Sequence, residues 1–390
     1  MHSENGEHFE ILDSWRGVCA IGVALGHAVI VSHIFEALLF GNVWLFVDFF
    51  FVLSGFVISH AYFGKLTSFR SMRVFIIRRF GRLWPLHMTL LAFLVAWEAV
   101  KTIMVSALHI AALPSDLLRD PRQTLDSILA NTALVQGIGW NSLFAAPYEW
   151  NAPSWSISVE FWTYLIFALI CVYGGRKATG LTITMAVFSI AMLILMIDEL
   201  LPSGSYELFR CICGFLVGHW VWRIARTIFV TARFATAAEI AVVVRAALYM
   251  TLANLGPLSL LAPVFFGPAV WVFSAGRGAI SSILRLPPFL NIGALSYSIY
   301  MTHFVILRAG LTFAKAADKF LHINIVTDYN VPGSGIAQFF NFGNRWIGDL
   351  SEIPYIAAVI IVSMLTFRYI EIPARNFFYQ KAGDIADRES

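Results

Sequence analysis

The residues best able to do chemistry in this chain are charged or titratable side chains inside apolar segments. In "DSWRGVCAIGVALGHAVIVSHIF" Arg16 and His27 lie 11 positions apart. On an α-helix this spacing is about three turns plus 20°, with about 16 Å of rise, so both side chains project from one face. Deep in a membrane His27 can act as a base, with Arg16 at the cytoplasmic rim; alternatively, His27 is a packed neutral imidazole and Arg16 an anchor. Gly22 and Gly26 form a small-xxx-small pair that lets another helix approach beside His27.

Two carboxylates also lie inside apolar segments. Asp48 is the one acid in "NVWLFVDFFFVLSGFVISHAYF", and it either orients His27 or pairs with an arginine. Glu160 lies about two turns into "SWSISVEFWTYLIFALICVY", in the outer half of the predicted span, with Ser156 on its own face. It can be a base, an acid or a partner for His27, or it can form a salt bridge to Arg210. Because a charge at the bilayer centre costs at least about 2.5 kcal/mol, each carboxylate should have a function or a specific partner.

A cluster of arginines begins the third apolar segment. The stretch "RSMRVFIIRRFGRLWPLH" contains Arg78, Arg79 and Arg82, and the last two share a helix face. Guanidinium groups bind phosphates through paired hydrogen bonds, so the cluster can hold a nucleotide or another anionic cofactor. The alternative is ordinary anchoring at the cytoplasmic surface or contact with anionic lipids.

The composition is that of a membrane protein. The chain has 390 residues, of which 58% are hydrophobic and only 13% are charged, too few to cover the surface of a soluble fold. No basic patch in a polar context suggests nucleic-acid binding. The four cysteines fall in apolar runs without a repeated Cys/His spacing, so we expect neither a disulfide framework nor a metal site. The first residues lack the basic region of a cleavable signal peptide.

Ten segments are apolar over roughly 20 residues, the length needed to cross the hydrocarbon core. We therefore expect an all-α integral membrane bundle of about ten transmembrane helices. The predicted spans are about 17–35, 43–63, 83–104, 154–173, 178–198, 206–222, 237–254, 257–276, 287–307 and 353–370.

The positions of Lys and Arg orient these spans, because short basic loops stay in the cytoplasm. The segment 64–82 holds six basic residues and no acid, so it should lie inside, and both termini are then cytoplasmic. The long connections 105–153 and 308–352 should lie outside as ordered caps or flat helices. We expect one membrane domain, residues 1–376, followed by a short cytoplasmic tail, residues 377–390.

Several of these segments resemble motifs of one known family. "LDSWRGVCAIGVALGHA" resembles the Arg-x10-His signature of the membrane acyltransferase-3 family, which consists of multi-pass bacterial O-acyltransferases. "FVDFFFVLSGFVIS", "RRFGRLWPLH" and "APSWSISVEFWTYL" look like its second-span, Arg-x-x-Arg and Ser-x-Ser-x-Glu motifs. "IGALSYSIYMTH" and "YIEIPARNFF" are similar to its ninth-span and carboxy-terminal patterns. The ordered set covers almost the whole chain.

The resemblance implies that an acyl group, usually acetyl, passes from cytoplasmic acyl-CoA to a hydroxyl group, in the bacterial inner membrane. By position, Arg16 and His27 match the essential pair, Arg79 and Arg82 the arginine pair, and Glu160 the acid of the fourth-span motif. The expected partners are acyl-CoA, a saccharide or lipid-linked glycan as acceptor, and membrane lipids, with no metal and no nucleic acid.

These expectations give each residue a role. His27 is expected to be the general base, and Glu160 or Asp48 holds its ring or stabilises its charged form. Transfer is either direct or through an acyl-enzyme. The phosphates of acyl-CoA are expected to bind Arg16, Arg78, Arg79 and Arg82. Further side chains expected to line the site are Ser54, Ser156, Ser158, Tyr297, Tyr300 and His303.

Two other classes of function fit the intramembrane polar residues. A proton-coupled transporter or flippase of a lipid-linked sugar would use His27, Glu160 and Asp48 as a proton relay, and it predicts flux without an acyl donor. Inverted repeats would favour it, but the sequence shows no internal repeat. A sensor or scaffold, in which these residues only specify helix packing, predicts mild effects from conservative changes at His27.

Overall fold

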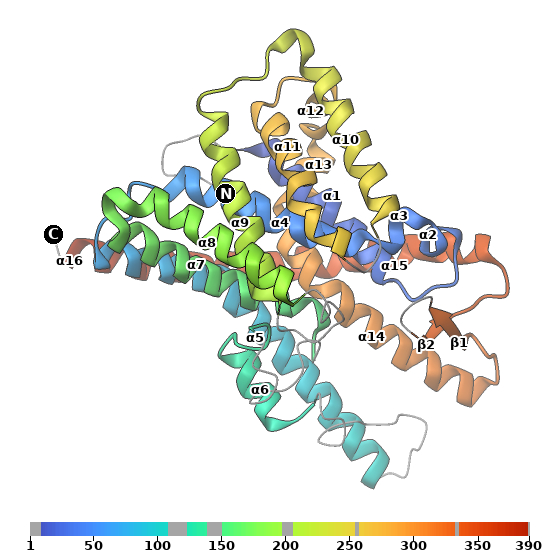
Figure 1. The fold of residues 1–390 in the computed structure, drawn as a ribbon. Coiled ribbons are helices and arrows are strands. Elements are labelled where there is room, and N and C mark those ends of the chain that lie inside the picture. The colour runs from blue at the N-terminus through green and yellow to red at the C-terminus, as the bar shows by residue number, and fades with distance from the viewer. Residues whose placement is uncertain are drawn as a thin grey trace.

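The protein is a helical bundle with one small β-hairpin at its edge (Figure 1). The computed structural model describes residues 9–107, 123–138, 150–196, 206–253, 257–331 and 335–388. The first half of the described chain holds α1 (Glu10–His27), α2 (His33–Glu36), α3 (Leu38–Gly41), α4 (Phe46–Tyr62), α5 (Phe69–Ala107), α6 (Leu125–Thr132), α7 (Trp155–Gly174) and α8 (Ala178–Leu195). The second half holds α9 (Glu207–Ala225), α10 (Ala235–Leu252), α11 (Ala262–Ala275), α12 (Ala279–Leu284), α13 (Pro287–Ala294), α14 (Ser296–Leu321), β1 (Val326–Val331), β2 (Gly335–Phe340), α15 (Arg345–Thr366) and α16 (Ile372–Arg388).

The bundle is an integral membrane fold, but the count of ten spans is not confirmed. By length and composition, seven helical segments in the described part of the chain can cross a membrane, or eight if one bent pair is a single span. One of the seven, Ala152–Leu195, contains both α7 and α8, which a 3-10 turn, Gly175–Lys177, separates. A helix of 18 to 20 residues is itself about 27 to 30 Å long, so this segment contains the lengths of two predicted spans.

The first predicted span, 17–35, is wrong in its position. The helix α1 starts earlier, at Glu10, and ends at His27. The chain beyond it is extended, because the amide of Val31 donates to the carbonyl of Phe340 and the amide of Phe340 donates to the carbonyl of Val29. His27 is therefore the last residue of a helix, beside the β-hairpin, and does not lie in the middle of a continuous span.

The last two predicted spans also differ from uniform helices. The ninth is broken at Leu295, where α13 and α14 meet at an angle of 69°. The tenth is part of a longer rod, in which a π-helical segment, Phe367–Glu371, joins α15 to α16. Residues 377–388, predicted to be a tail, are part of α16. This helix packs along α5, and Phe378 contacts Gly81.

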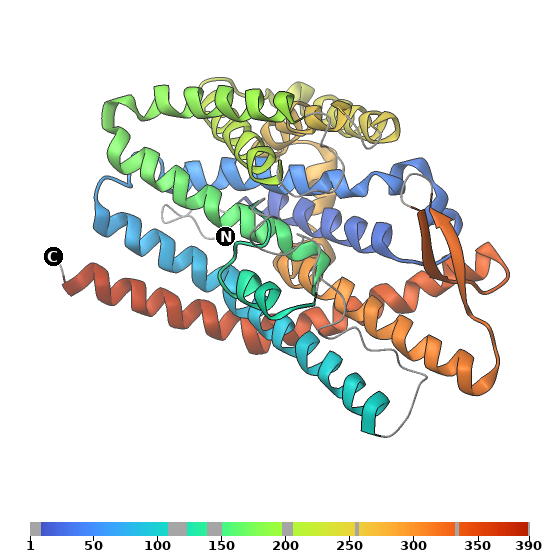
Figure 2. The same cartoon turned by 60° about the horizontal axis from the view of Figure 1, so that its bottom comes forward.

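The two ends of the bundle carry different connections (Figure 2). The α4–α5 connection, the α7–α8 turn with Arg176 and Lys177, and the end of α16 lie on the left of that view, whereas α2, α3 and the hairpin lie on the right. The start of the segment 64–82, which its Lys and Arg content predicts to be cytoplasmic, thus lies at the same end as the α7–α8 turn and the end of α16. The cytoplasmic location of both termini stays a prediction.

Close helix crossings fix the helices that carry the polar residues. A Cβ atom added to Gly17 would lie 2.5 Å from the backbone of Ile292, and one added to Gly293 would lie 2.7 Å from the backbone of Asp13. Only glycine lets α1 and α13 approach to this distance. A Cβ atom added to Gly26 would lie 2.0 Å from a side-chain methyl carbon of Val43, in the 3-10 segment before α4.

Candidate active site

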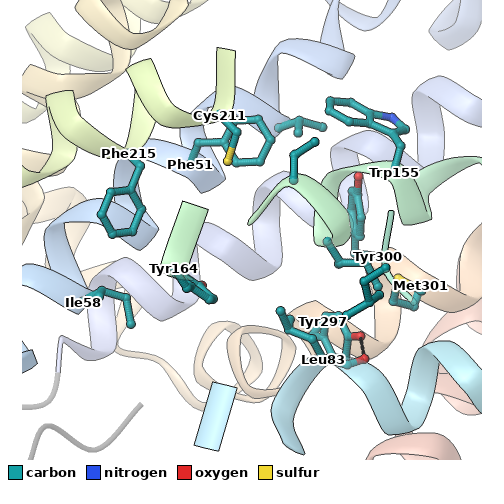
Figure 3. Close-up of a cluster of buried hydrophobic side chains, with 14 of the residues drawn as sticks. Phe51, Ile58, Leu83, Trp155, Tyr164, Cys211, Phe215, Tyr297, Tyr300 and Met301 are labelled. Carbon is teal, nitrogen blue, oxygen red and sulfur yellow. Dashed lines mark hydrogen bonds between the residues drawn. The ribbon is translucent and has the colours of Figure 1, made fainter. Parts of the chain in front are cut away.

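A polar cavity lies where α1, α4, α5, α7 and α14 meet. Its volume is about 50 Å³, enough for a few water molecules. Figure 3 shows several of its side chains among the neighbouring apolar core. The polar lining consists of Arg16, Ser54, Arg82, Ser156, Glu160, Tyr164, Ser296, Tyr297 and Tyr300, and the apolar lining includes Phe50 and Phe51.

Glu160 lies at this cavity with a hydroxyl donor on its own helix. The hydroxyl of Tyr164, one turn further along α7, donates to Oε1 of Glu160 at 2.5 Å. Since that hydroxyl has one proton, the 2.8 Å contact between Tyr164 and Ser54 is a donation from the serine. The chain of bonds from Ser54 through Tyr164 to Glu160 joins α4 to α7 and fixes the orientation of the carboxylate.

Two further tyrosines of the cavity lining are fixed by hydrogen bonds. Tyr297 donates to the carbonyl of Leu83 at 2.5 Å, a bond drawn in Figure 3. Tyr300 contacts the hydroxyl of Ser156 at 2.8 Å and donates to the carbonyl of Pro153 at 3.1 Å. These three bonds tie α14 to neighbouring segments, so the start of α14 is anchored at the cavity.

A second pocket, of about 210 Å³, opens on the same two arginines. Arg16 and Arg82 line it together with Arg375, Glu371 and Asp13. Asp13 pairs with Arg16 at 3.5 Å across one helical turn. Glu371 ends the π-helical segment, a distortion often found at functional sites, and it accepts a hydrogen bond from Ser298 at 3.0 Å. We call this second pocket the arginine vestibule.

The other two predicted phosphate ligands lie elsewhere. The guanidinium of Arg79 lies over the rings of Tyr62 and Phe75, at 5.4 and 5.7 Å, and it also donates to the Tyr62 hydroxyl. The guanidinium of Arg78 lies 5.2 Å from the ring centroid of Tyr379 on α16. The cluster that the sequence presents as one group is therefore divided, and Arg82 is the member of it that lines the cavity and the vestibule.

His27 contacts a second histidine. Its Nδ1 lies 3.1 Å from Nε2 of His303 on α14, and the ring centroids are 5.1 Å apart with an interplanar angle of 23°. Arg16 and His27 thus both lie toward α14, Arg16 in the cavity with Tyr297 near the start of α14 and His27 at His303, two turns further along. His27 is not among the residues that line the cavity; Tyr300 links the two places, because it lines the cavity and its ring lies 6.0 Å from that of His303.

Asp48 is paired with an arginine rather than with a histidine. Arg210 on α9 donates to both carboxylate oxygens of Asp48, through Nε at 2.8 Å and through a second bond from Nη2. The Arg210 guanidinium also lies over the ring of Trp44, 4.8 Å from its centroid. The salt bridge proposed as an alternative for Glu160 is therefore made by Asp48, and neither carboxylate is bonded to His27 in the described residues.

Sequence reasoning also placed Ser158 at the site and overlooked three residues. The hydroxyl of Ser158 donates to the carbonyl of Leu134 at 2.6 Å, away from the cavity. Tyr164 could have been predicted as a neighbour of Glu160 from the sequence, because it follows Glu160 by four residues on one helix face. Glu371 and Arg375 lie in "YIEIPARNFF", but nothing local places that segment beside Arg16.

The described residues contain no group of three or more His, Cys, Asp or Glu side chains arranged to hold a metal ion. The cavity and the vestibule together present three guanidiniums, which suit anionic ligands, and four carboxylates, those of Glu10, Asp13, Glu160 and Glu371.

The fold and the site define an integral membrane protein with a polar cavity and an adjoining pocket lined by three arginines and three acids. Residues 9–368 match the family described as "Acyltransferase domain", so the chain belongs to the acyltransferase-3 family. Membership of this family supports an O-acyltransferase activity, and it confirms the resemblance found in the motifs. The chain is also similar to "Protein 2 in picA locus" of Rhizobium radiobacter, with 29% identity over 204 residues that cover 49% of this chain and 94% of that protein. No solved structure matches the chain.

Proposed function

We propose that the protein transfers an acyl group, acetyl in the simplest case, from cytoplasmic acyl-CoA to a hydroxyl of a saccharide or glycolipid acceptor in the bacterial inner membrane. The observation that carries the proposal is that Arg16 and Arg82 line both the arginine vestibule and the buried cavity. An anionic ligand held in the vestibule is thereby next to the interior of the bundle.

The vestibule suits the phosphates of acyl-CoA. Arg16, Arg82 and Arg375 all line it, and guanidinium groups bind phosphate oxygens through paired, charge-assisted bonds. The segment 64–82, which ends at Arg82, is predicted from its Lys and Arg content to face the cytoplasm, where acyl-CoA is found. The 11 residues from Arg16 to His27 correspond to about 16 Å along α1, comparable to the reach of an extended pantetheine arm.

His27 is the proposed general base. Its nitrogen takes the proton of the acceptor hydroxyl as the oxygen attacks the thioester carbonyl, the carbon–sulfur bond breaks, and the proton passes to the departing thiolate. Because Tyr300 lines the cavity next to His303, this route requires the Tyr300 side chain to move aside for the thioester. Glu160, held by Tyr164, acts in this scheme as the counter-charge that keeps the arginines at the cavity.

The transporter alternative needs a connected proton relay. The three residues proposed for it, His27, Glu160 and Asp48, have different partners: His303, Tyr164 and Arg210 respectively. This separation supports acyl transfer over proton-coupled transport.

The test is an assay of purified protein with labelled acetyl-CoA and envelope glycans. We expect labelled product from the unmodified protein and none from His27→Ala. Arg82→Gln should raise KM for acetyl-CoA roughly 10- to 150-fold, the effect of losing about 1.5–3 kcal/mol of charged hydrogen bonding.

The matched control is Arg78→Gln, a change of the same type to an arginine that stacks on Tyr379 outside both pockets. Its KM should stay near that of the unmodified protein. Turnover by His27→Ala, or equal KM values for the Arg78 and Arg82 variants, would contradict the proposal.

A further inference from the structure

Two histidines in van der Waals and hydrogen-bonding contact form an arrangement that the proposed phosphate and acceptor chemistry does not explain. His303 is fully buried on α14, whereas His27 is partly accessible at the end of α1. Their nitrogens are 3.1 Å apart, within hydrogen-bond distance, although two imidazoles can bond only if one donates and the other accepts.

A backbone carbonyl decides which ring donates. Nδ1 of His303 lies 3.2 Å from the carbonyl oxygen of Ile299, one turn earlier on α14. A carbonyl oxygen can only accept, so Nδ1 of His303 carries the proton. In a neutral imidazole the other nitrogen then has the lone pair, and Nε2 of His303 is an acceptor facing His27.

The consequence for His27 follows directly. Its Nδ1 must carry a proton to donate to His303, so its Nε2 keeps the free lone pair. That is the nitrogen not committed to the histidine pair, and it is the one left to take a proton from another molecule.

The backbone around the pair is fixed by a residue of a third helix. The hydroxyl of Tyr355 on α15 lies 3.3 Å from the carbonyl of Ala24 and 3.3 Å from the carbonyl of His303. This three-centre contact holds α1 and α14 at the level of the two rings. The two histidines therefore lie on helices whose relative position is fixed. A residue that orients another side chain needs such a rigid support.

We propose that His303 is a positioning residue that holds His27 in the Nδ1–H tautomer and stabilises the imidazolium formed at His27 during acyl transfer. When Nε2 of His27 takes the acceptor proton, the ring becomes cationic and its Nδ1–H bond to the neutral His303 becomes charge-assisted and stronger. His303 takes no proton and touches no substrate. The inference rests on the proposed function for its catalytic meaning, but the tautomer can be tested without activity.

The first measurement is the ¹⁵N NMR spectrum of protein labelled in its histidine rings. The chain has ten histidines, so the His27 signals are assigned by their loss in His27→Gln. We expect a protonated Nδ1 and an unprotonated Nε2 at His27. An Nε2–H tautomer there overturns the inference whatever the activity.

The second measurement compares two substitutions of His303. Glutamine places an oxygen acceptor near the position of Nε2, whereas leucine has a similar size and no acceptor. We expect His303→Leu to lower kcat about 10- to 100-fold, the range known for partners that orient metal-binding histidines, with KM for acetyl-CoA unchanged. His303→Gln should recover most of the lost kcat, and equal kcat values for the two variants overturn the inference.

A control pair separates this effect from the general loss of a buried histidine. His87 on α5 is also buried, and its Nε2 lies 3.0 Å from the carbonyl of Asn131, away from both pockets. His87→Leu and His87→Gln should have similar kcat values. If the unmodified protein shows the Nδ1–H tautomer but no acyl transfer, the pairing of the histidines is supported and the proposed function is what fails.

Discussion

The pair formed by Asp48 and Arg210 gives the sharpest prediction, because the sequence allowed Asp48 a catalytic role that its contacts do not suggest. The two side chains are 1% and 5% exposed, and they share two hydrogen bonds. Removing one member of a buried pair leaves the other charge uncompensated, at a cost of about 3–5 kcal/mol. We expect Asp48→Asn to lie at the lower end of this range, because Glu207 is 3.7 Å from Arg210 and remains. Arg210→Gln should lie at the upper end, because it leaves two carboxylates.

The measurement is thermal unfolding in detergent, with a double-mutant cycle. For a chain of this length each kcal/mol lowers the melting temperature by roughly 1–2 °C, so the single variants should melt about 3–10 °C lower. In the double variant the asparagine and glutamine amides can still bond to each other, so its loss should be smaller than the sum of the single losses. Asp384→Asn, the same change at an exposed position of α16, is the matched control and should leave melting unchanged.

The outcome separates a structural from a catalytic role. If Asp48 only holds α4 to α9, acyl transfer by the folded fraction of Asp48→Asn should be close to normal. If Asp48→Asn melts like the unmodified protein but has lost turnover, the structural role is refuted and Asp48 takes part in acyl transfer.

Three further predictions follow from single contacts. Gly17→Val should force α1 away from the backbone of Ile292, where even a Cβ would lie at 2.5 Å, and lower stability by about 1–3 kcal/mol in thermal unfolding; unchanged melting would contradict the crossing. Glu239→Gln should lower stability by about 1–3 kcal/mol without changing KM for acetyl-CoA, because the carboxylate accepts three backbone N–H groups at the start of α12. Tyr164→Phe, which removes the donor to Glu160, should raise KM for acetyl-CoA about tenfold, because Glu160 is the counter-charge of the arginines that bind it, and an unchanged KM would argue against the role given to that bond.

Part of the fold was readable from the sequence because long apolar runs have few alternatives in a membrane. The predicted spans 154–173, 178–198 and 237–254 nearly coincide with α7, α8 and α10. In lipid every backbone polar group must be bonded within the chain, so a run of that length must be helical. Arg245, which interrupts the last of these runs, is accommodated by donating to the carbonyl of Phe265 at 2.6 Å.

The position of the first span could not be predicted from its apolar residues. The residues after His27, "AVIVSHIF", are as apolar as a helix continuation, but Val29 and Val31 bond to Phe340 of β2 and a short separate helix, α2, starts at His33. That pairing joins Ile30 to Phe340 across more than 300 residues of chain. Hydrophobic periodicity describes local conformation and contains no information about such a partner.

The sequence by itself determined that this is a membrane bundle of the acyltransferase-3 family, and it identified Arg16, His27 and Glu160 as residues that need a reason to be buried. Charge in an apolar segment is costly, and that cost is visible in one dimension. Only the tertiary structure decided the partners: His303 for His27, Tyr164 and the cavity for Glu160, and Arg210 for Asp48. Contacts between helices depend on close crossings such as that of Gly17 with α13, which arise from the packing of distant segments.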